Sequence, residues 1–132
     1  MKLLGIDYGL KKVGLAIGDD QSYLAQPYLV LKVSGSNQHS LVRRINDFCG
    51  KLEIDQIIVG MPGGKLAVKI KRFGKDLQQL TNLPVLYQDE TLTSKEAVDK
   101  MIGAGVKRKL RREKEDAVSA ALILEKYLEN YV

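Results

Sequence analysis

The chain has 132 residues, of which 45% are hydrophobic and 28% are charged, and its formal net charge is +5. This length suits one compact domain, residues 1–132, with a proper core. No apolar stretch is long enough to span a bilayer, and the N-terminus lacks the apolar core of a signal peptide. The single cysteine, Cys49, excludes an intramolecular disulfide framework, so a cytoplasmic protein is the simplest interpretation.

Five short apolar segments are typical of β-strands. The first three are separated by turn-rich residues, and their spacing predicts an antiparallel meander. The fourth is a continuous apolar run of the kind found in strands buried on both faces. The last ends in two acids. The segments are Lys2–Asp7, Val13–Gly18, Tyr28–Val33, Ile54–Gly60 and residues 83–90.

Apolar residues recur at helical spacing in three segments, residues 41–52, 66–80 and 113–130. Ser36 and Asn37 are candidate caps for the first of them. A T-x-x-E capping box predicts a shorter helix over residues 93–103, with a glycine-rich basic loop after it. Strands that are linked by helices should run parallel to their neighbours, so we expect one α/β domain.

Basic residues are concentrated in KRKLRREKED, which contains Lys107, Arg108, Lys109, Arg111, Arg112 and Lys114. A charge run of this kind is often only a solvated face. A second basic group consists of Lys65, Lys69, Lys71 and Arg72. If both groups share a face, the charge favours nucleic acid as the partner.

Acidic residues stand where strands end or a helix begins. Asp7 ends the first predicted strand, Asp89 and Glu90 end the last, and Asp116 opens the final helix. In an open α/β sheet, ligands gather beyond the carboxyl ends of the strands. Three converging carboxylates repel one another unless a cation joins them, and hard oxygen ligands select Mg²⁺ or Mn²⁺. Two such ions, about 4 Å apart, can clamp the attacking and leaving oxygens of a phosphodiester.

Any one of these acids alone would more often be a turn former or a helix cap. Their coincidence with glycines and lysines favours the functional interpretation. Gly9 would let a backbone approach a phosphate closely, with Lys11 or Lys12 facing that phosphate. Lys65 follows an exposed glycine turn at a helix start, where it is a second candidate phosphate contact.

Four blocks that contain these residues resemble a known family: GIDYGLKKVGLAIGD, IIVGMP, DETLTSKEA and KEDAVSAALILEKYL. They closely resemble the YqgF/RuvX family of the ribonuclease H-like superfamily, in the family's order and over nearly the whole chain. Its members are described as Holliday-junction resolvases and as nucleases that mature the 5′ end of precursor 16S rRNA.

The resemblance implies a ribonuclease H-like α/β fold. Its five-stranded mixed sheet would have the first three strands antiparallel, the last two parallel to the first, and helices on its flanks. The resemblance also implies phosphodiester hydrolysis that depends on Mg²⁺ or Mn²⁺. Asp7, Glu90 and Asp116 match the family's acids and are the expected catalytic and metal-binding residues, with Asp89 and Glu113 as auxiliary carboxylates. The expected substrate contacts are Gly9, Lys11, Lys12, Lys65, Lys107, Arg108, Arg111 and Arg112.

The chain departs from the family pattern at three places. Thr91 stands where arginine is usual, and the loop over residues 61–65 is short. Well-studied junction resolvases carry an acid on the fourth strand, where this chain has Val59 and Gly60. The lack of an acid on the fourth strand weakens a direct transfer of resolvase activity to this chain, whereas Thr91 and the short loop affect contacts with the substrate.

Three functional hypotheses remain. The first is a metal-dependent nuclease that acts on structured RNA, above all precursor 16S rRNA. The second is a Holliday-junction resolvase, which needs two sites on a symmetric dimer. The third is a non-catalytic nucleic-acid-binding module. A phosphate-transferring ATPase of this superfamily would need two lobes, for which the chain is too short. We expect a monomer or a weak homodimer, with no membrane partner.

Overall fold

The computed structural model describes residues 1–33, 37–89 and 108–130, and over residues 108–114 it describes the backbone alone. Five strands and three helices lie within these ranges. They are β1 (Lys2–Tyr8), β2 (Lys12–Asp19), β3 (Leu24–Lys32), α1 (Gln38–Leu52), β4 (Gln56–Met61), α2 (Leu66–Thr81), β5 (Val85–Asp89) and α4 (Arg108–Glu129). The helix expected over residues 93–103 lies outside the described residues.

The five strands form one mixed sheet in the order β3-β2-β1-β4-β5. β1 pairs with β2 and β2 pairs with β3 in antiparallel register. β4 runs parallel to β1, and β5 runs parallel to β4. The predicted meander and the two parallel strands that follow it are therefore confirmed.

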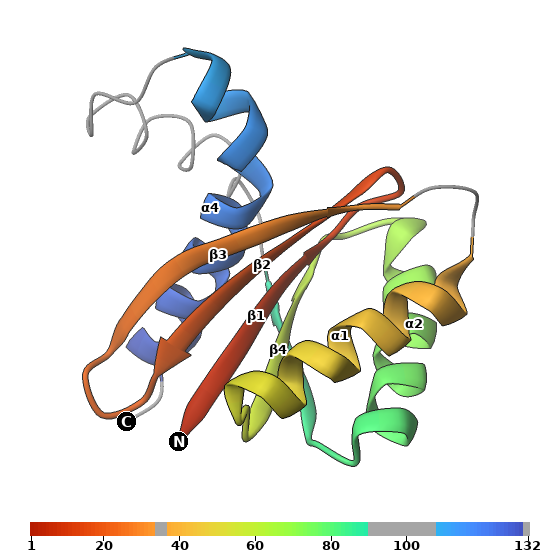
Figure 1. Cartoon of the computed structure of the whole chain (residues 1–132), viewed down its shortest axis with the longest axis horizontal. Helices are drawn as coiled ribbons and strands as arrows, with labels where there is room; N and C mark the ends of the chain where they lie inside the picture. Colours follow the sequence, from red (N-terminus) through yellow and green to blue (C-terminus); the bar gives the residue numbers. More distant parts are fainter. Residues whose placement is uncertain (34–36, 90–107, 131–132) are drawn as a thin grey trace.

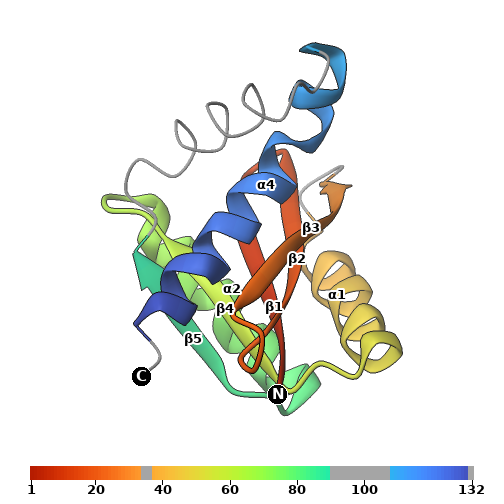
Figure 2. The same cartoon turned by 90° about the vertical axis from the view of Figure 1, so that its left-hand side faces the viewer.

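Helices cover both faces of the sheet (Figures 1 and 2). α1 and α2 pack on one face, where Leu4 and Ile6 of β1 belong to a large buried cluster. α4 crosses the other face, where Leu3 is buried with Ala120 and Leu124 of that helix. The sheet is thus buried on both sides, as the continuous apolar runs of its central strands require.

α1 begins where a candidate cap was predicted. The Asn37 side chain accepts a hydrogen bond from the backbone N–H of Ser40, at 3.1 Å. Ser36, the other candidate, lies outside the described residues. Cys49 is buried on the apolar face of α1, and this burial raises the pKa of its thiol to about 11. The cysteine is therefore a protonated core side chain at neutral pH.

β3 begins at Leu24, four residues before the predicted Tyr28. Pro27 lies inside this extension, and a proline rarely continues a strand. β3 is the edge strand of the sheet, and its pairing with β2 is irregular between Leu15 and Ala16, opposite Pro27. Edge strands and bulges tolerate proline because no ladder hydrogen bond is required from its nitrogen.

α4 begins at Arg108, so the prediction of a basic loop up to residue 112 is wrong for its last five residues. No glycine or proline occurs between Val106 and Asn130. Lysine, arginine and leucine are also good helix formers, so the basic segment extends the amphipathic helix by more than a turn. Within the described residues, no helix is long and apolar enough to cross a membrane.

Candidate active site

Strand alternation places Asp7 on the face of the sheet that α4 covers. On β1, Leu4 and Ile6 are buried beneath α1 and α2, whereas Leu3 is buried beneath α4. Gly5 also faces α4, since a side chain at this position would collide with that helix. Successive residues of a strand point to opposite faces, so Asp7 shares the α4 face with Leu3 and Gly5.

A glycine on the neighbouring strand pairs with Asp7 and also lies in close contact with α4. Gly14 of β2 is the strand partner of Asp7. A Cβ added at Gly14 would overlap the carbonyl oxygen of Asp116 and would lie 2.7 Å from the backbone nitrogen of Ala117. Only glycine therefore allows α4 to pack so closely here. This contact brings Asp7 and Asp116 to the same face and the same end of the sheet.

Asp116 is half-buried, and burial raises the pKa of its carboxyl above the ordinary value. The ammonium group of Lys12 acts in the opposite direction and lowers that pKa. Lys12 lies two residues before Gly14 on β2, so alternation places it on the same face as Asp116. The site thus contains a partly desolvated acid with a cation nearby, which is a common signature of functional sites.

The end of β5 lies at the same end of the sheet but presents its acid to the other face. Asp89 pairs with Met61, the last residue of β4. The hydroxyl of Tyr87 lies against α2. By alternation, Asp89 therefore stands on the α1/α2 face, opposite to Asp116. Glu90, the third predicted acid, lies outside the described residues, and the side chain of Glu113 is not described.

In the part of the chain whose side chains are described, no group of three or more histidine, cysteine, aspartate or glutamate side chains could hold a metal ion. Asp7 and Asp116 are therefore two carboxylates of a candidate set whose third member is not described. Carboxylate oxygens are the donors that Mg²⁺ and Mn²⁺ prefer, so the residues in place suit such an ion.

The β1–β2 turn and the first residue of β2 contain three of the predicted substrate contacts. A Cβ added at Gly9 would lie 2.6 Å from the carbonyl oxygen of Lys12, so the turn itself requires a glycine here. The side chains of Lys11 and Lys12 are exposed. Lys65 is exposed at the start of α2, after Gly64 with its positive φ of 83°. All of these residues lie at the carboxyl ends of β1 and β4.

The remaining predicted contacts belong to the basic segment before Asp116. Arg108, Arg111 and Arg112 lie in the first turns of α4, and Lys107 lies outside the described residues. The two basic groups do not share a face, because α2 and α4 cover opposite faces of the sheet (Figure 2). They lie instead on either side of the same end of the sheet, where the strand-end acids are found.

Gly14 is a site residue that the sequence reasoning missed. Gly5 and Gly18 share its role, since a side chain at either would crowd Leu124 of α4. The opposing helix face is rich in small residues, including Ala117 and Ala120. The sequence does contain a pattern that could have predicted this close packing. Glycines recur on one face of two adjacent strands, and the last helix is rich in small residues.

The sheet order and the helix that crosses the sheet define a ribonuclease H-like fold. A solved structure described as Thermus thermophilus RuvC in complex with a Holliday junction substrate has the same fold, with a TM-score of 0.65 and 18% sequence identity. The match covers 99% of this chain and 95% of that one.

Sequence comparison then gives the family. The family model "RuvX: Holliday junction resolvase" matches residues 1–130, so the chain belongs to the RuvX family and is a nuclease. A protein from Protochlamydia amoebophila is 33% identical over 98% of this chain and 93% of its own length. One from Agathobacter rectalis is 35% identical over 98% of this chain and 95% of its own length. Both relatives carry the name "Putative pre-16S rRNA nuclease".

Proposed function

We propose that residues 1–132 form a single domain that hydrolyses phosphodiester bonds in structured RNA, with Asp7, Glu90 and Asp116 as its catalytic and metal-binding acids. The observation that supports this most strongly is the close packing of Asp116 on Gly14, the strand partner of Asp7. Two carboxylates from distant parts of the sequence thereby share one face at the carboxyl end of β1. Ligands of open α/β sheets gather at this end of the strands.

The proposed cofactor is Mg²⁺ or Mn²⁺, bound as two ions. Nucleases of this kind generally use divalent metals, and the donors here are hard carboxylate oxygens. When bound, such ions polarise the phosphoryl oxygen and activate the attacking water. Asp7 and Asp116 would hold them together with Glu90. Asp89, on the opposite face, is less well placed to assist than the resemblance alone implies.

The protein's own contribution is to hold the acids and the substrate in position. Hydrolysis forms a bond from a water oxygen to phosphorus and breaks one P–O ester bond, so no nucleophilic side chain is needed. Asp7 is fixed by its paired strand, and Asp116 is fixed by the contact of α4 with Gly14. The positive charge of Lys12 favours the ionised form of Asp116, which is the form that would bind a metal ion.

We further propose that the basic residues around this edge bind the phosphates on either side of the cleaved bond. Lys12 lies on the α4 face, with Lys107, Arg108, Arg111 and Arg112 proposed as further contacts on that side. Gly9 and Lys11 are proposed contacts from the β1–β2 turn, and Lys65 from the start of α2. Contacts to phosphates position a nucleic acid without reading its sequence. Selectivity would then depend on the shape of the RNA and on where its strands separate.

Precursor 16S rRNA is the proposed substrate, cut near its 5′ end in the cytoplasm. This rests on the name shared by the relatives that cover almost the whole chain. Resolution of Holliday junctions is the second candidate, favoured by the family description and by the structural likeness to RuvC. That reaction would need a symmetric dimer with two sites.

Replacement of Asp7 by asparagine tests the proposal. Asp7→Asn keeps the shape of the side chain and removes its charge, so we expect cleavage of an RNA with a precursor 5′ extension to fall by about 100-fold or more. Affinity for that RNA should stay the same or rise slightly, because one anion near phosphate is removed. Rates are measured by gel assay with Mg²⁺, Mn²⁺ or Ca²⁺, and affinity by fluorescence anisotropy in EDTA.

Asp47→Asn is the matched control, since Asp47 is an exposed acid on α1 and the chemical change is identical. It should cleave at the wild-type rate. Equal rates for wild type and Asp7→Asn would overturn the proposal, as would an absence of metal-dependent cleavage on RNA and branched DNA alike. A preference for four-way junction DNA over the RNA, with paired nicks, would replace the first candidate with the second.

A further inference from the structure

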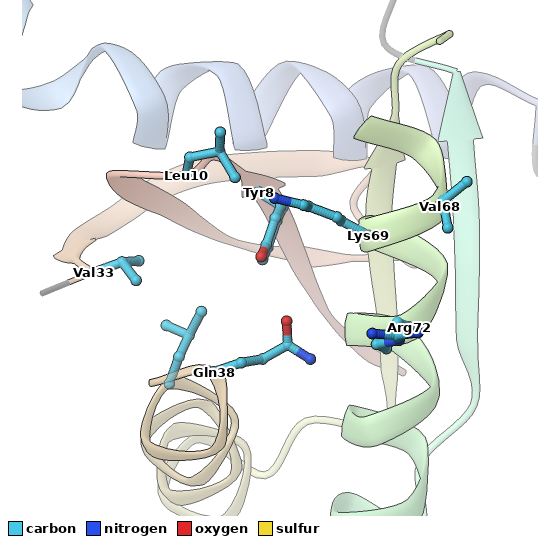
Figure 3. A pocket seen from close by; sticks show the side chains of 8 residues that line it. Tyr8, Leu10, Val33, Gln38, Val68, Lys69 and Arg72 are labelled. Atoms are coloured by element: carbon cyan, nitrogen blue, oxygen red, sulfur yellow. The ribbon is translucent and has the colours of Figure 1, made fainter. Parts of the chain in front are cut away.

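A cavity lies on the opposite face of the sheet from Asp116, at the same end. It has a volume of about 480 Å³, within the usual range for small-molecule sites. Its polar lining consists of Tyr8, Gln38, Lys69 and Arg72. Figure 3 shows Tyr8 and Gln38 pointing towards one another from β1 and α1, while the two cations come from α2. Among the residues that the structure describes, no acidic side chain lines this cavity, so its charge suits an anion.

The remainder of the lining is aliphatic. Leu41 is almost fully buried at the base, whereas Leu10 is 61% exposed and Val68 is 70% exposed at the rim. Val33 completes this lining. These exposed side chains extend the apolar surface of the cavity to its opening. The combination of an apolar wall with two cations suits a ligand that is flat and apolar in one part and anionic in another.

Two polar side chains that line the cavity are already oriented by other contacts. The Tyr8 ring packs on Phe73 with a centroid distance of 4.6 Å. The amide nitrogen of Gln38 donates to Asp76 at 2.8 Å, which leaves the amide oxygen as an acceptor. Burial raises the pKa of Tyr8, so its hydroxyl keeps its proton at neutral pH. The cavity thus offers a fixed donor and a fixed acceptor beside an apolar surface.

The position of the cavity relates it to the candidate active site. Asp7 and Tyr8 are consecutive residues of β1, with Cα atoms about 3.8 Å apart, and their side chains point to opposite faces. Asp7 faces α4, and Tyr8 lines the cavity. A strand that passes over the end of the sheet would therefore reach the cavity within a few nucleotides of the bond being cut, given a rise of about 3.4 Å per stacked nucleotide.

We propose that the cavity between α1 and α2 holds one unpaired nucleotide of the substrate strand. The base would lie against Leu41 and Val68, with its edge towards Tyr8 and Gln38, while its phosphate would face Lys69 and Arg72. This proposal rests on the proposed nuclease function and adds the feature that the enzyme would recognise. That feature is a strand that leaves its duplex close to the cleavage point.

The test compares a hairpin with a single-stranded 5′ extension and a blunt hairpin with the same total number of nucleotides, so that both carry equal numbers of phosphates. Affinities are measured by fluorescence anisotropy in EDTA at one salt concentration, with RNA and DNA versions of both. Contacts of a base with an aromatic side chain contribute about 1–3 kcal/mol, and Tyr8 lines the cavity, so we expect wild type to prefer the extended hairpin by about 5–150-fold. Comparing two ligands cancels the general attraction of a basic protein for phosphate.

Two pairs of variants localise that preference. Val68→Trp fills the cavity from its exposed rim and should abolish the preference, whereas Val68→Ala, at the same position, should retain most of it. Lys69→Ala and Arg72→Ala should each reduce the preference. Lys71→Ala is the control, because Lys71 is an exposed cation on the same helix and does not line the cavity. Circular dichroism confirms that each variant is folded.

The inference is overturned if Val68→Trp retains the wild-type preference, or if Lys69→Ala and Lys71→Ala change it equally. It is also overturned if wild type shows no preference for the extended hairpin. The nuclease proposal is judged separately, by cleavage in the Asp7→Asn variant. Loss of the preference in Val68→Trp would support the cavity even if no cleavage were found. A preference seen for RNA but not for DNA would identify the ribose as part of the recognised ligand.

Discussion

Asp116 is an acid whose ionised form is destabilised by its position in the fold. Burial raises the pKa of its carboxyl, and only part of that effect is offset by Lys12. A carboxyl whose pKa is raised on folding binds its proton more tightly in the folded than in the unfolded chain. Its ionised form therefore opposes folding, and this cost grows as the pH rises above the ordinary value of 3.8. Such a cost is expected where an acid is kept for a ligand.

The asparagine variant of this residue should show the cost directly. In EDTA at pH 7, we expect Asp116→Asn to melt at a higher temperature than wild type, because the neutral amide removes the desolvated charge. The difference should shrink as the pH is lowered towards 4, where the wild-type carboxyl becomes protonated. Adding Mg²⁺ should raise the melting temperature of wild type and not of the variant. A lower melting temperature for the variant at pH 7 would contradict this account.

At the level of the secondary-structure element, the close packing of α4 on the sheet requires glycines in the strands beneath it. Gly5, Gly14 and Gly18 together leave room for the backbone and for Leu124 of the helix. The helix contributes small residues of its own, such as Ala117 and Ala120. Because Asp116 lies within this contact, the packing that stabilises α4 also determines the distance between the two acids.

Gly14→Ala should therefore damage both stability and activity. The new Cβ would meet backbone atoms of α4, which cannot move aside as a side chain can. We expect a loss of about 1–3 kcal/mol in the free energy of unfolding, and a loss of cleavage even where the variant is folded. Urea denaturation measures the first and a gel assay measures the second.

Gly50→Ala provides the matched control for this prediction. Gly50 lies in α1 with open space around it, so alanine should stabilise the protein by about 0.5–1 kcal/mol through helix propensity. Cleavage should be unaffected. If Gly14→Ala behaved like Gly50→Ala, α4 could not be packed on β2 as described.

Element types were largely predictable from the sequence, because apolar periodicity distinguishes strands from helices. The strand directions followed from the connections, since short turns favour antiparallel pairs and a helix between two strands favours a parallel pair. Boundaries were less predictable where two preferences competed. Proline is unfavourable in most strands, yet β3 includes Pro27 because it is an edge strand. The basic segment before Asp116 was predicted to be a loop, although its residues favour a helix.

The candidate site was only partly predictable, for a different reason. Asp7 and Asp116 could be picked out as acids at element ends, but their neighbourhood depends on Gly14, which carries no chemistry of its own. The cavity beside Tyr8 was not predicted at all. Its lining comes from β1, α1, α2 and the ends of two loops, and no single segment of sequence contains its pattern.

At the scale of the whole molecule, the basic residues divide between the two faces of the sheet. The first turns of α4 project beyond the sheet on one side, while α2 begins on the other (Figure 1). Asp7, near the end of β1, lies in the sheet between these two helices. A nucleic acid bound across this end of the sheet would meet positive charge on both sides, which would hold its backbone against the acids despite their negative charge.

The α4 group can be tested through the salt dependence of binding. Each phosphate that a basic side chain neutralises releases a condensed counterion, so log Kd depends on log salt with a slope of about 0.7–0.9 per phosphate. Replacing both Arg111 and Arg112 by glutamine should weaken binding of unrelated RNA sequences about equally. It should also reduce the slope by roughly one for each phosphate that is no longer neutralised. Fluorescence anisotropy over a series of KCl concentrations measures both quantities.

Arg43→Gln with Arg44→Gln forms the matched control, because these two arginines are exposed on α1 and the double variant has the same net charge. Its slope should equal that of wild type. If the two double variants weaken binding equally and leave equal slopes, then net charge alone attracts the nucleic acid, and the first turns of α4 are only a solvated face. If only the α4 pair changes the slope, phosphates lie against α4 next to Asp116, where the proposed reaction requires them.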